Sequence, residues 1–320
     1  MKALVYTGVE TLELQEVADP VQEAGASIVR IASSGICGSD MHAYLGHDAR
    51  RPAPLILGHE AAGTTDDGRR VTINPLVTCG ACPACAAGRD NLCATRQIIS
   101  MPPREGAFAQ SVAIPARNLV PIPDAMTFDQ AALAEPIACG WHAVRLAIAA
   151  GGAAPALVIG GGPIGVGAAL SLIAQGMTDV TVIEPNATRR SYLSDRCGLR
   201  CVGPETLNTP RFGIVVDGVG YAATRAQASA LCAPGGVIVH IGLGQSEGGL
   251  DIRRMTLQEI GFIGTYTYTA ADFRDTVAAM ADGRLGALDW TETRPLTDGA
   301  RAFADIRAGR VPAPKIILKP

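Results

Sequence analysis

Four cysteines crowd into one short stretch of the chain, at Cys79, Cys82, Cys85 and Cys93. Their spacing, Cys-x2-Cys-x2-Cys-x7-Cys, puts four thiols on one expected loop. Thiolates suit zinc, and four of them close a tetrahedron around the ion without leaving an open position. The alternative is four unrelated free thiols, which would be prone to oxidation on an exposed loop. The spacing therefore predicts a structural zinc site.

A second group of potential metal ligands is dispersed along the chain. Cys37 lies in the run Gly-Ile-Cys-Gly-Ser-Asp, His59 and Glu60 follow a glycine, and Glu135 precedes a proline. A lone histidine is more often a satisfied polar residue than a ligand, and a glutamate before proline usually ends a helix. Spacing alone therefore does not assemble these four residues into a site.

A glycine-rich motif, G-x-G-x-x-G, lies between an expected strand at 156–159 and an expected helix at 163–175. Its residues are Gly160, Gly161, Gly162, Pro163, Ile164 and Gly165. The first glycine permits a tight turn, the second lets the backbone approach a pyrophosphate, and the third lets the helix pack on the strand. Free N–H groups at the start of the helix then face the phosphates. Packing alone could also require such a turn, but its context favours a dinucleotide site.

An acidic residue follows the motif at the distance that dinucleotide sites require. Glu184 ends the next expected strand, about 20 residues further on, where a carboxylate accepts hydrogen bonds from the adenosine ribose. The same charge repels a 2′-phosphate, so NAD is favoured over NADP. Arg189 and Arg190 weaken this preference, because a nearby arginine can hold a phosphate. We therefore expect NAD, with NADP as the less favoured cofactor and Arg189 close to it.

The elements that must position these residues fall into two kinds. Short β-like runs separated by Gly, Pro and Asp occupy the first part of the chain, at 2–7, 11–17, 27–33, 70–74 and 108–114. From about residue 128 helices and apolar strands take over. Strands without polar alternation, separated by helices, predict a parallel sheet that is covered on both faces.

The order of these elements predicts an α/β protein in which a β-rich domain is interrupted by an inserted α/β domain. Strands are expected at 156–160, 179–184, 212–217 and 237–242, with helices at 163–175, 187–196 and 224–231 between them. Two helices and a strand at 315–318 end the chain. We place the β-rich domain at 1–136 and 267–320, and the inserted domain at 137–266.

Length and composition agree with two domains. The chain has 320 residues, 48% hydrophobic and 18% charged, which is enough apolar material for sizeable cores at about 150 residues a domain. The net charge is −3, with both signs scattered along the chain. Because no basic stripe offers a surface to phosphates, a nucleic-acid partner is not expected.

One uncharged stretch, between Arg145 and Asp179, imitates a membrane span. Its many glycines and prolines favour a buried strand, a turn and a core helix instead, so no membrane association is expected. Glu10 follows the first residues too closely for a secretory signal peptide. Nine cysteines without an export signal indicate a reducing compartment, which we take to be the cytoplasm.

The run Gly58-His59-Glu60-Ala61-Ala62-Gly63, the four-cysteine loop and the nucleotide motif, in this order, resemble the zinc-dependent medium-chain alcohol and polyol dehydrogenases. The resemblance covers nearly the whole chain. It implies a GroES-like catalytic domain and an inserted Rossmann domain with a doubly wound parallel sheet. Relatives of this kind are often dimers or tetramers, so a homodimer or homotetramer is expected.

The resemblance also assembles the dispersed ligands. Cys37, His59 and Glu135 match the ligands of the family's catalytic zinc, and Glu135 stands where the alcohol-dehydrogenase branch has cysteine. With glutamate at this position, the chain resembles the branch of the family that contains the sorbitol, threonine and sugar-alcohol dehydrogenases. Glu60 matches a neighbour that ligates zinc when water or substrate leaves, or that only orients the other ligands.

Two further residues match the family's proton relay. The resemblance implies that the proton of the alcohol leaves through Ser39 and a cofactor ribose hydroxyl to His42, while a hydride passes to the nicotinamide. A surface histidine without a task is the alternative for His42. The catalytic residues expected are Cys37, Ser39, His42, His59, Glu60 and Glu135.

The function expected is zinc-dependent transfer of a hydride from a secondary alcohol to NAD, giving a ketone. The small-molecule substrate would be a polyol, a sugar acid or a sugar-alcohol phosphate. Arg50 and Arg51, in the loop at 44–54, would suit an anionic substrate, although a solvated loop explains them equally well. Two alternatives stay open: a zinc-free quinone or enoyl reductase on the same fold, and a non-catalytic nucleotide-binding sensor with structural zinc only.

Overall fold

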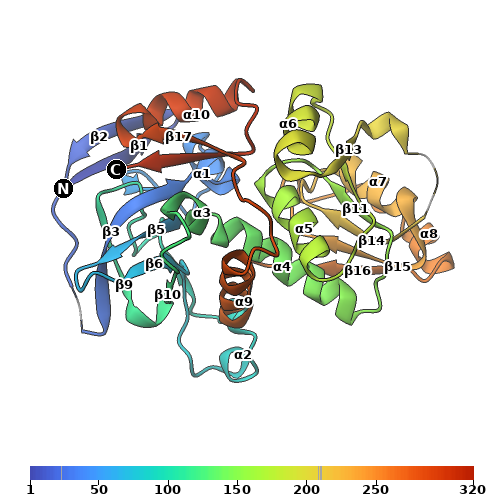
Figure 1. Ribbon diagram of the computed structural model, residues 1–320, viewed down its shortest axis with the longest axis horizontal. Coiled ribbons are helices and arrows are strands. Elements are labelled where there is room, and N and C mark those ends of the chain that lie inside the picture. The colour runs from blue at the N-terminus through green and yellow to red at the C-terminus, as the bar shows by residue number, and fades with distance from the viewer. Residues whose placement is uncertain (23, 208, 210) are drawn as a thin grey trace. The chain divides into compact units, whose positions relative to one another are not determined.

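The computed structural model describes residues 1–22, 24–207, 209 and 211–320 (Figure 1). The chain divides into two compact units. The first comprises Met1–Glu135 and Thr291–Pro320, and the second comprises Pro136–Trp290. Each unit encloses its own hydrophobic core.

The first unit is built mainly of β-strands. Its largest sheet has seven strands in the order β10-β6-β5-β3-β18-β17, with β9 also paired to β3. A second sheet has the order β2-β1-β4, and β7 pairs with β8. The strands are β1 (Lys2–Gly8), β2 (Thr11–Glu16), β3 (Ala26–Gly35), β4 (Leu55–Ile56), β5 (Glu60–Thr65), β6 (Arg70–Ile73), β7 (Leu76–Val77), β8 (Gln97–Ile98), β9 (Ser111–Pro115), β10 (Leu119–Pro121), β17 (Thr291–Pro295) and β18 (Lys315–Lys319).

Short helices lie among these strands and at the unit's surface. They are α1 (Gly38–Tyr44), α2 (Pro83–Ala86), α3 (Phe128–Ala132) and α10 (Gly299–Arg307). In Figure 1 α10 lies beside β1 and β2, and it contacts β2. The unit is therefore a β-rich domain with few helices, as the sequence predicts.

The central strand of the large sheet is β3. It pairs antiparallel with β5, β9 and β18, and Val29 and Ile31 enter a core that also holds Ile73 and Ile114. Its pairing with β18 brings the last residues of the chain beside residues 34 and 35. This register delivers the last strand to the region where β3 ends and α1 begins.

The second unit has a six-stranded parallel sheet with the order β13-β12-β11-β14-β15-β16. Its strands are β11 (Ala156–Ile159), β12 (Val180–Ile183), β13 (Arg200–Val202), β14 (Phe212–Asp217), β15 (Cys232–His240) and β16 (Gly261–Gly264). Numbered along the chain, this order is 3-2-1-4-5-6, the doubly wound order of dinucleotide-binding sheets. The predicted Rossmann domain is confirmed.

Helices precede, connect and follow the parallel strands, in the alternation that the sequence predicts. They are α4 (Ala134–Ala149), which begins at the boundary of the two units, and α5 (Pro163–Ala174), α6 (Ala187–Cys197), α7 (Ala222–Leu231), α8 (Ile252–Leu257) and α9 (Ala270–Ala281). Between the sheet and α7, buried residues such as Leu157, Val215, Ile238 and Leu231 form a hydrophobic core. None of the helices in the described part of the chain is long and apolar enough to cross a bilayer.

The contacts of α9 place residues 270–281 in the second unit, whereas the sequence analysis puts the return to the first domain at residue 267. Asp272, in the first turn of α9, accepts hydrogen bonds from His142 Nδ1 at 2.7 Å and Arg145 Nε at 2.6 Å, both on α4. It also caps its own helix through Thr269. This buried cluster ties α9 to α4.

We expect Asp272→Ala to lower the free energy of unfolding by about 3 kcal/mol, because it leaves His142 and Arg145 without their shared partner. Burial alone would raise the pKa of Asp272, but hydrogen bonds from His142 and Arg145 hold it well below its usual range. Ionised Asp272 therefore makes its full contribution to the free energy of unfolding above about pH 4, the ordinary carboxyl pKa. This contribution is lost as the pH falls through the lower pKa that Asp272 has in the folded state. Urea unfolding at a series of pH values measures it.

Asp282→Ala is the matched control, since Asp282 pairs with Arg284 where both side chains are about half exposed. Exposed pairs contribute about 0–1 kcal/mol. Equal losses in the two variants would contradict the role given to Asp272.

Candidate active site and zinc loop

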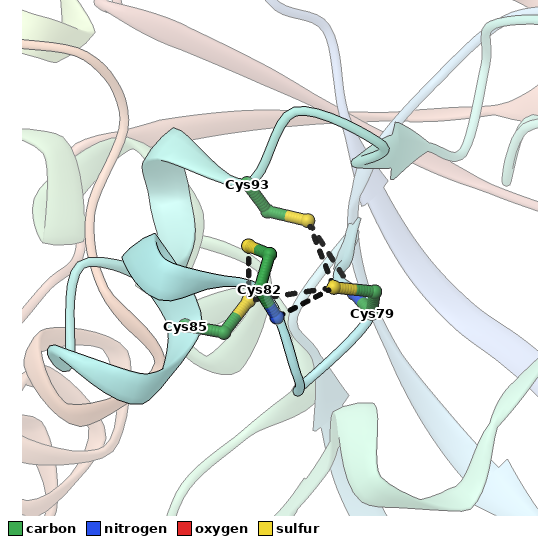
Figure 2. Close-up of side chains that lie close together, drawn as sticks. All are labelled: Cys79, Cys82, Cys85 and Cys93. Carbon is green, nitrogen blue, oxygen red and sulfur yellow. Dashed lines mark hydrogen bonds between the residues drawn. The ribbon is translucent and has the colours of Figure 1, made fainter.

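The four-cysteine loop lies between β7 and β8 (Figure 2). Cys82 caps α2, with Pro83 in the first helical position, and Cys85 lies within the same short helix. Cys93 follows a 3₁₀ turn at Asp90–Leu92. Two tight turns of backbone therefore aim all four sulfur atoms inward, as Figure 2 shows.

The separations of these sulfur atoms fit a zinc ion. The Sγ–Sγ distances are 3.5 Å for Cys82–Cys85, 3.6 Å for Cys79–Cys93 and 4.0 Å for Cys79–Cys85. Zinc–sulfur bonds of about 2.3 Å at tetrahedral angles place sulfur atoms about 3.8 Å apart. The predicted ligands thus already have the spacing that zinc requires.

Backbone N–H groups favour the thiolate form of Cys79 and Cys93, whereas burial raises the pKa of Cys85 to about 11. The N–H of Cys79 lies 3.5 Å from the Cys93 sulfur and lowers the pKa of Cys93 to about 6. The N–H groups of Ala81 and Cys82 lie 3.5 and 3.3 Å from the Cys79 sulfur and lower the pKa of Cys79. Thiolate is the form that binds metal.

A second cluster forms where β3 ends. The ligand atoms of Cys37, His59 and Glu60 lie within 4.8 Å of one another. Cys37 is the residue before α1, His59 precedes β5, and Glu60 opens β5 opposite Gly35 of β3. A Cβ on Gly35 would come within 2.2 Å of Glu60 Oε2, so only glycine leaves room for this carboxylate.

Asp40 contacts two of these residues, Cys37 and His59, and holds them in place. This buried carboxylate accepts hydrogen bonds from the N–H of Cys37 at 3.0 Å and the N–H of Gly58 at 3.2 Å, and its Oδ1 lies 3.5 Å from His59 Nδ1. Burial lowers the pKa of His59, but the charges of Asp40 and then Cys37 raise it well above its usual range. With Nδ1 engaged by Asp40, Nε2 is left to bind a metal.

Glu60 forms a fully buried ion pair with Lys315 of β18. The Lys315 Nζ lies 2.6 Å from each carboxylate oxygen of Glu60 and donates to Ile36 O at 2.7 Å. Burial disfavours the charged lysine, but Glu60 and then Cys37 raise the pKa of Lys315. Both oxygens of Glu60 thus share one ammonium group, with hydrogen-bond geometry at Oε1. A buried carboxylate beside a thiol and an imidazole is a donor set that fits a zinc ion.

Glu135 lies near this cluster but is not part of it. It is the second residue of α4, is only 6% exposed, and contributes to raising the pKa of Lys315. Within the described chain, the compact set of ligand atoms holds Cys37, His59 and Glu60, without Glu135. The structure therefore brings together three of the four predicted ligands and puts the fourth toward the same lysine.

The two residues predicted to form the proton relay, Ser39 and His42, both lie on α1. Ser39 Oγ is 3.5 Å from His59 Nε2, so its hydroxyl borders the metal cluster. His42 is exposed near the end of the helix, with its ring edge-on to His47 at 6.5 Å between centroids. One residue is thus at the cluster and the other at the surface, as a proton path requires.

Arg51 is not available to an anionic substrate. It is 4% exposed, and it donates to Ser100 O at 3.0 Å and to Asp48 at 2.5 Å. Arg50 also pairs with Asp48, at 2.8 Å, while its side chain stays largely exposed. Asp48 therefore pairs with both arginines, but its single negative charge balances only one of them, and the Arg50 side chain stays largely exposed.

The glycine motif forms the predicted turn between β11 and α5. Gly160 has φ of 100°, and a Cβ on Gly165 would lie 1.8 Å from Gly160 O. Both positions therefore require glycine. Gly162 caps α5, Pro163 takes its first position, and the space beside the Gly162 Cα is open. The turn is shaped to let a phosphate approach the start of the helix.

Glu184 reaches back to this turn from the end of β12. Its Oε2 accepts a hydrogen bond from the N–H of Gly161 at 3.0 Å, and its Oε1 accepts one from Asn186 N–H at 2.7 Å. The Arg189 N–H donates to the Asn186 side chain, which caps α6, and Arg190 donates to Glu184 O. The predicted cofactor residues are thus adjacent.

Residues 23–124 match the family model "Alcohol dehydrogenase GroES-like domain", and residues 163–282 match "Zinc-binding dehydrogenase". The chain is also 30% identical to L-galactonate-5-dehydrogenase of Escherichia coli, over 90% of this chain and 89% of that protein. It belongs to the zinc-dependent medium-chain dehydrogenases. Within this family it resembles the polyol and sugar-acid dehydrogenases, and it is an oxidoreductase that acts on CH–OH donors.

Two other similar proteins support this assignment. One is 2-dehydro-3-deoxy-L-galactonate 5-dehydrogenase of Pseudoalteromonas atlantica, 29% identical over 96% of this chain and 95% of that protein. The other is the structure of a zinc-binding dehydrogenase of Sinorhizobium meliloti with NADP bound. It has a TM-score of 0.88 and 25% identity, covering 100% of this chain and 99% of that chain.

Three residues at the site of this dehydrogenase escaped the sequence analysis. Asp40 stands three residues after Cys37, the spacing of a capping box, and that signal could have found it. Lys315 lies 255 residues from Glu60 along the chain, and Ser100 contacts His59 from a loop 41 residues away. Nothing local marks either residue.

We expect Cys93→Ser to reduce the zinc content from two ions per chain to one, because a four-thiolate site does not close with three ligands. Metal analysis of the purified variant measures this, and thermal unfolding should show a lower Tm. Cys232→Ser is the control, since Cys232 is buried in the core of the second unit. A C93S variant that retains two tightly bound zinc ions would contradict the assignment of the loop.

Lys315→Met should destabilise the metal-free protein by about 3–5 kcal/mol, because it leaves the Glu60 carboxylate buried without its counter-charge. Zinc should restore part of this loss, since the ion supplies the missing positive charge. Urea unfolding with and without zinc measures both effects. Lys319→Met on the same strand is the control, because its pair with Asp129 is partly exposed and should contribute about 1 kcal/mol or less. Equal losses would refute the account.

Proposed function

We propose that this dehydrogenase oxidises a secondary hydroxyl of a sugar acid or a related polyol to a ketone, with zinc and NAD. The observation that carries the proposal is the cluster of Cys37, His59 and Glu60, whose ligand atoms lie within 4.8 Å of one another and are of the types that bind zinc. The names of the relatives from Escherichia coli and Pseudoalteromonas atlantica, both dehydrogenases of sugar acids, support the substrate class.

The proposed zinc ligands are Cys37, His59 and Glu135, with Glu60 as the residue that ligates when another ligand leaves. Bound zinc would act as a Lewis acid that acidifies the substrate hydroxyl and polarises the product carbonyl. Asp40 holds the Cys37 backbone and the His59 ring in place. Lys315 neutralises Glu60, and it lies close enough to Glu135 for the charge of that residue to raise the pKa of the lysine.

The proton of the substrate hydroxyl is taken up by residues of α1. The Ser39 hydroxyl lies beside His59 and can accept and pass on a proton without changing its own charge. His42, exposed to solvent on the same helix, is the acceptor from which the proton reaches water. A ribose hydroxyl of the cofactor is proposed to join the two.

The cofactor is proposed to be NAD. Two backbone N–H groups fix the Glu184 carboxylate at the edge of the glycine turn, where it can accept hydrogen bonds from ribose hydroxyls and repel a 2′-phosphate. Gly160, Gly162, Pro163, Ile164 and Gly165 would receive the pyrophosphate. Arg189, at the start of α6, is the residue that would favour NADP binding by holding the 2′-phosphate.

We further propose that the protein is a homodimer or homotetramer of the cytoplasm. Strand β16 is an edge of the parallel sheet, with Phe262 40% exposed on it and Ile252 and Leu257 exposed on the preceding helix. An exposed apolar strand edge is a template for pairing with a second chain. All nine cysteines are free thiols in the structure, as a reducing compartment allows.

A substrate panel tests the proposed function. Zinc-replete protein is given L-galactonate, other aldonates, polyols, sugar-alcohol phosphates and 2-propanol, each with NAD and with NADP, and reduced cofactor is measured by absorbance. Turnover is expected with sugar acids or polyols and NAD, and Cys37→Ser should abolish it. Activity that survives in C37S would favour zinc-free chemistry. Silence across the panel, with zinc and NADH both bound, would overturn the proposal.

Glu184→Ala should weaken NAD binding by at least ten-fold, because the ribose loses its acceptor, and should weaken NADP binding much less. Titration of protein fluorescence with NADH and NADPH measures both affinities. Glu184→Gln is the control for lost hydrogen bonds to Gly161 and Asn186, since an amide oxygen can keep one of them. Equal losses for the two cofactors in E184A would refute the role of Glu184 in selecting NAD.

A further inference from the structure

Ser100 touches the imidazole that the proposed function makes a zinc ligand. Its side chain is fully buried, and its Oγ lies 3.3 Å from His59 Nδ1. The Oδ1 of Asp40 lies 3.5 Å from the same nitrogen. Two oxygen atoms therefore face Nδ1, one from α1 and one from the segment after β8.

The backbone of Ser100 has a conformation that serine normally avoids. Its φ is 70°, in the left-handed region that favours glycine. Residues other than glycine persist there only when their surroundings hold them, and they gather at functional sites. A glycine at position 100 would fold more easily, so the serine side chain must have a use of its own.

Buried polar contacts hold Ser100 in this conformation. The Arg51 Nε donates to the Ser100 carbonyl oxygen at 3.0 Å, and the Arg51 Nη1 donates to Asp48 at 2.5 Å. Because Arg51 is almost fully buried, this contact anchors the turn from inside the protein. Its result is a serine hydroxyl held against the His59 ring.

We propose that Ser100 is a positioning residue that, together with Asp40, fixes the ring of His59 for zinc. The inference rests on the proposed function, in which His59 Nε2 binds the metal. Nδ1 then carries a hydrogen, and the Ser100 and Asp40 oxygen atoms accept it from two sides. Partners of this kind keep a ligating histidine in one tautomer and orientation, and their loss typically weakens metal binding about 10–100-fold.

Two substitutions separate the hydroxyl from the strained backbone. Ser100→Gly removes both, so it should unfold at the same or a higher urea concentration than the wild type while binding catalytic zinc at least ten-fold more weakly. Ser100→Ala removes the hydroxyl and keeps the strain, so it should lose zinc affinity to the same extent without gaining stability. A purely structural role predicts no loss of zinc affinity in either variant.

Zinc affinity is measured by competition with a coloured chelator, without reference to turnover. His59→Ala identifies the step of the titration that belongs to the catalytic site, since the four-cysteine site keeps its ion. Ser171→Ala is the matched control: Ser171 is a buried serine in the second unit whose hydroxyl has no hydrogen-bond partner among the described residues. It should leave both zinc affinities unchanged.

Catalytic zinc affinities within two-fold of the wild type in both S100G and S100A would overturn the inference. So would a loss in S100G alone, because that result would assign the effect to the backbone instead of the hydroxyl. If wild type and H59A titrate identically, the protein has no zinc site at His59. That outcome refutes the proposed function itself, and it is distinguishable from the other two because it appears before any Ser100 variant is compared.

Discussion

The catalytic half of this dehydrogenase is organised around one buried ion pair, Lys315 with Glu60. Both side chains are fully buried, and the lysine also donates to the carbonyl oxygen of Ile36. Removing two charges from water costs several kcal/mol per ion. Such a pair therefore persists only where its geometry is good and further hydrogen bonds satisfy its remaining polar atoms. Strand β18, which carries Lys315, must therefore be in register with β3 for this ion pair to form.

The same pair sets the electrostatics of the cluster. Cys37, Glu60 and Glu135 are all potential anions near one ammonium group, and Asp40 adds a further buried carboxylate beside His59. A single lysine cannot balance them. Under the proposed function, a divalent cation held by Cys37, His59 and Glu60 would supply the missing positive charge. Glu60 is the carboxylate that such an ion and Lys315 would share.

The sequence was sufficient wherever the chemistry is local. The cysteine spacing predicted a cluster whose sulfur atoms lie 3.5–4.0 Å apart, and the glycine motif predicted a turn in which two positions admit only glycine. The alternation of strands and helices predicted the parallel sheet. It missed two of the six strands: β13, which has only three residues (Arg200–Val202), and β16, whose four residues Gly261–Gly264 include two glycines and carry almost no strand signal. It also missed the attachment of α9 to α4, which depends on a contact 130 residues apart.

The residues that sequence could not supply are those whose role exists only in three dimensions. Lys315 lies in an apolar strand pattern, where a lysine normally faces solvent, and only the pairing of β18 with β3 turns it inward. Ser100 belongs to no recognisable motif, and the sequence around it does not predict its left-handed backbone conformation. Both are unfavourable locally, one as a buried charge and one as strained backbone. A folded protein tolerates such residues when the surrounding contacts offset their unfavourable free energy. A residue that is unfavourable locally and also makes a buried polar contact therefore points to the functional site.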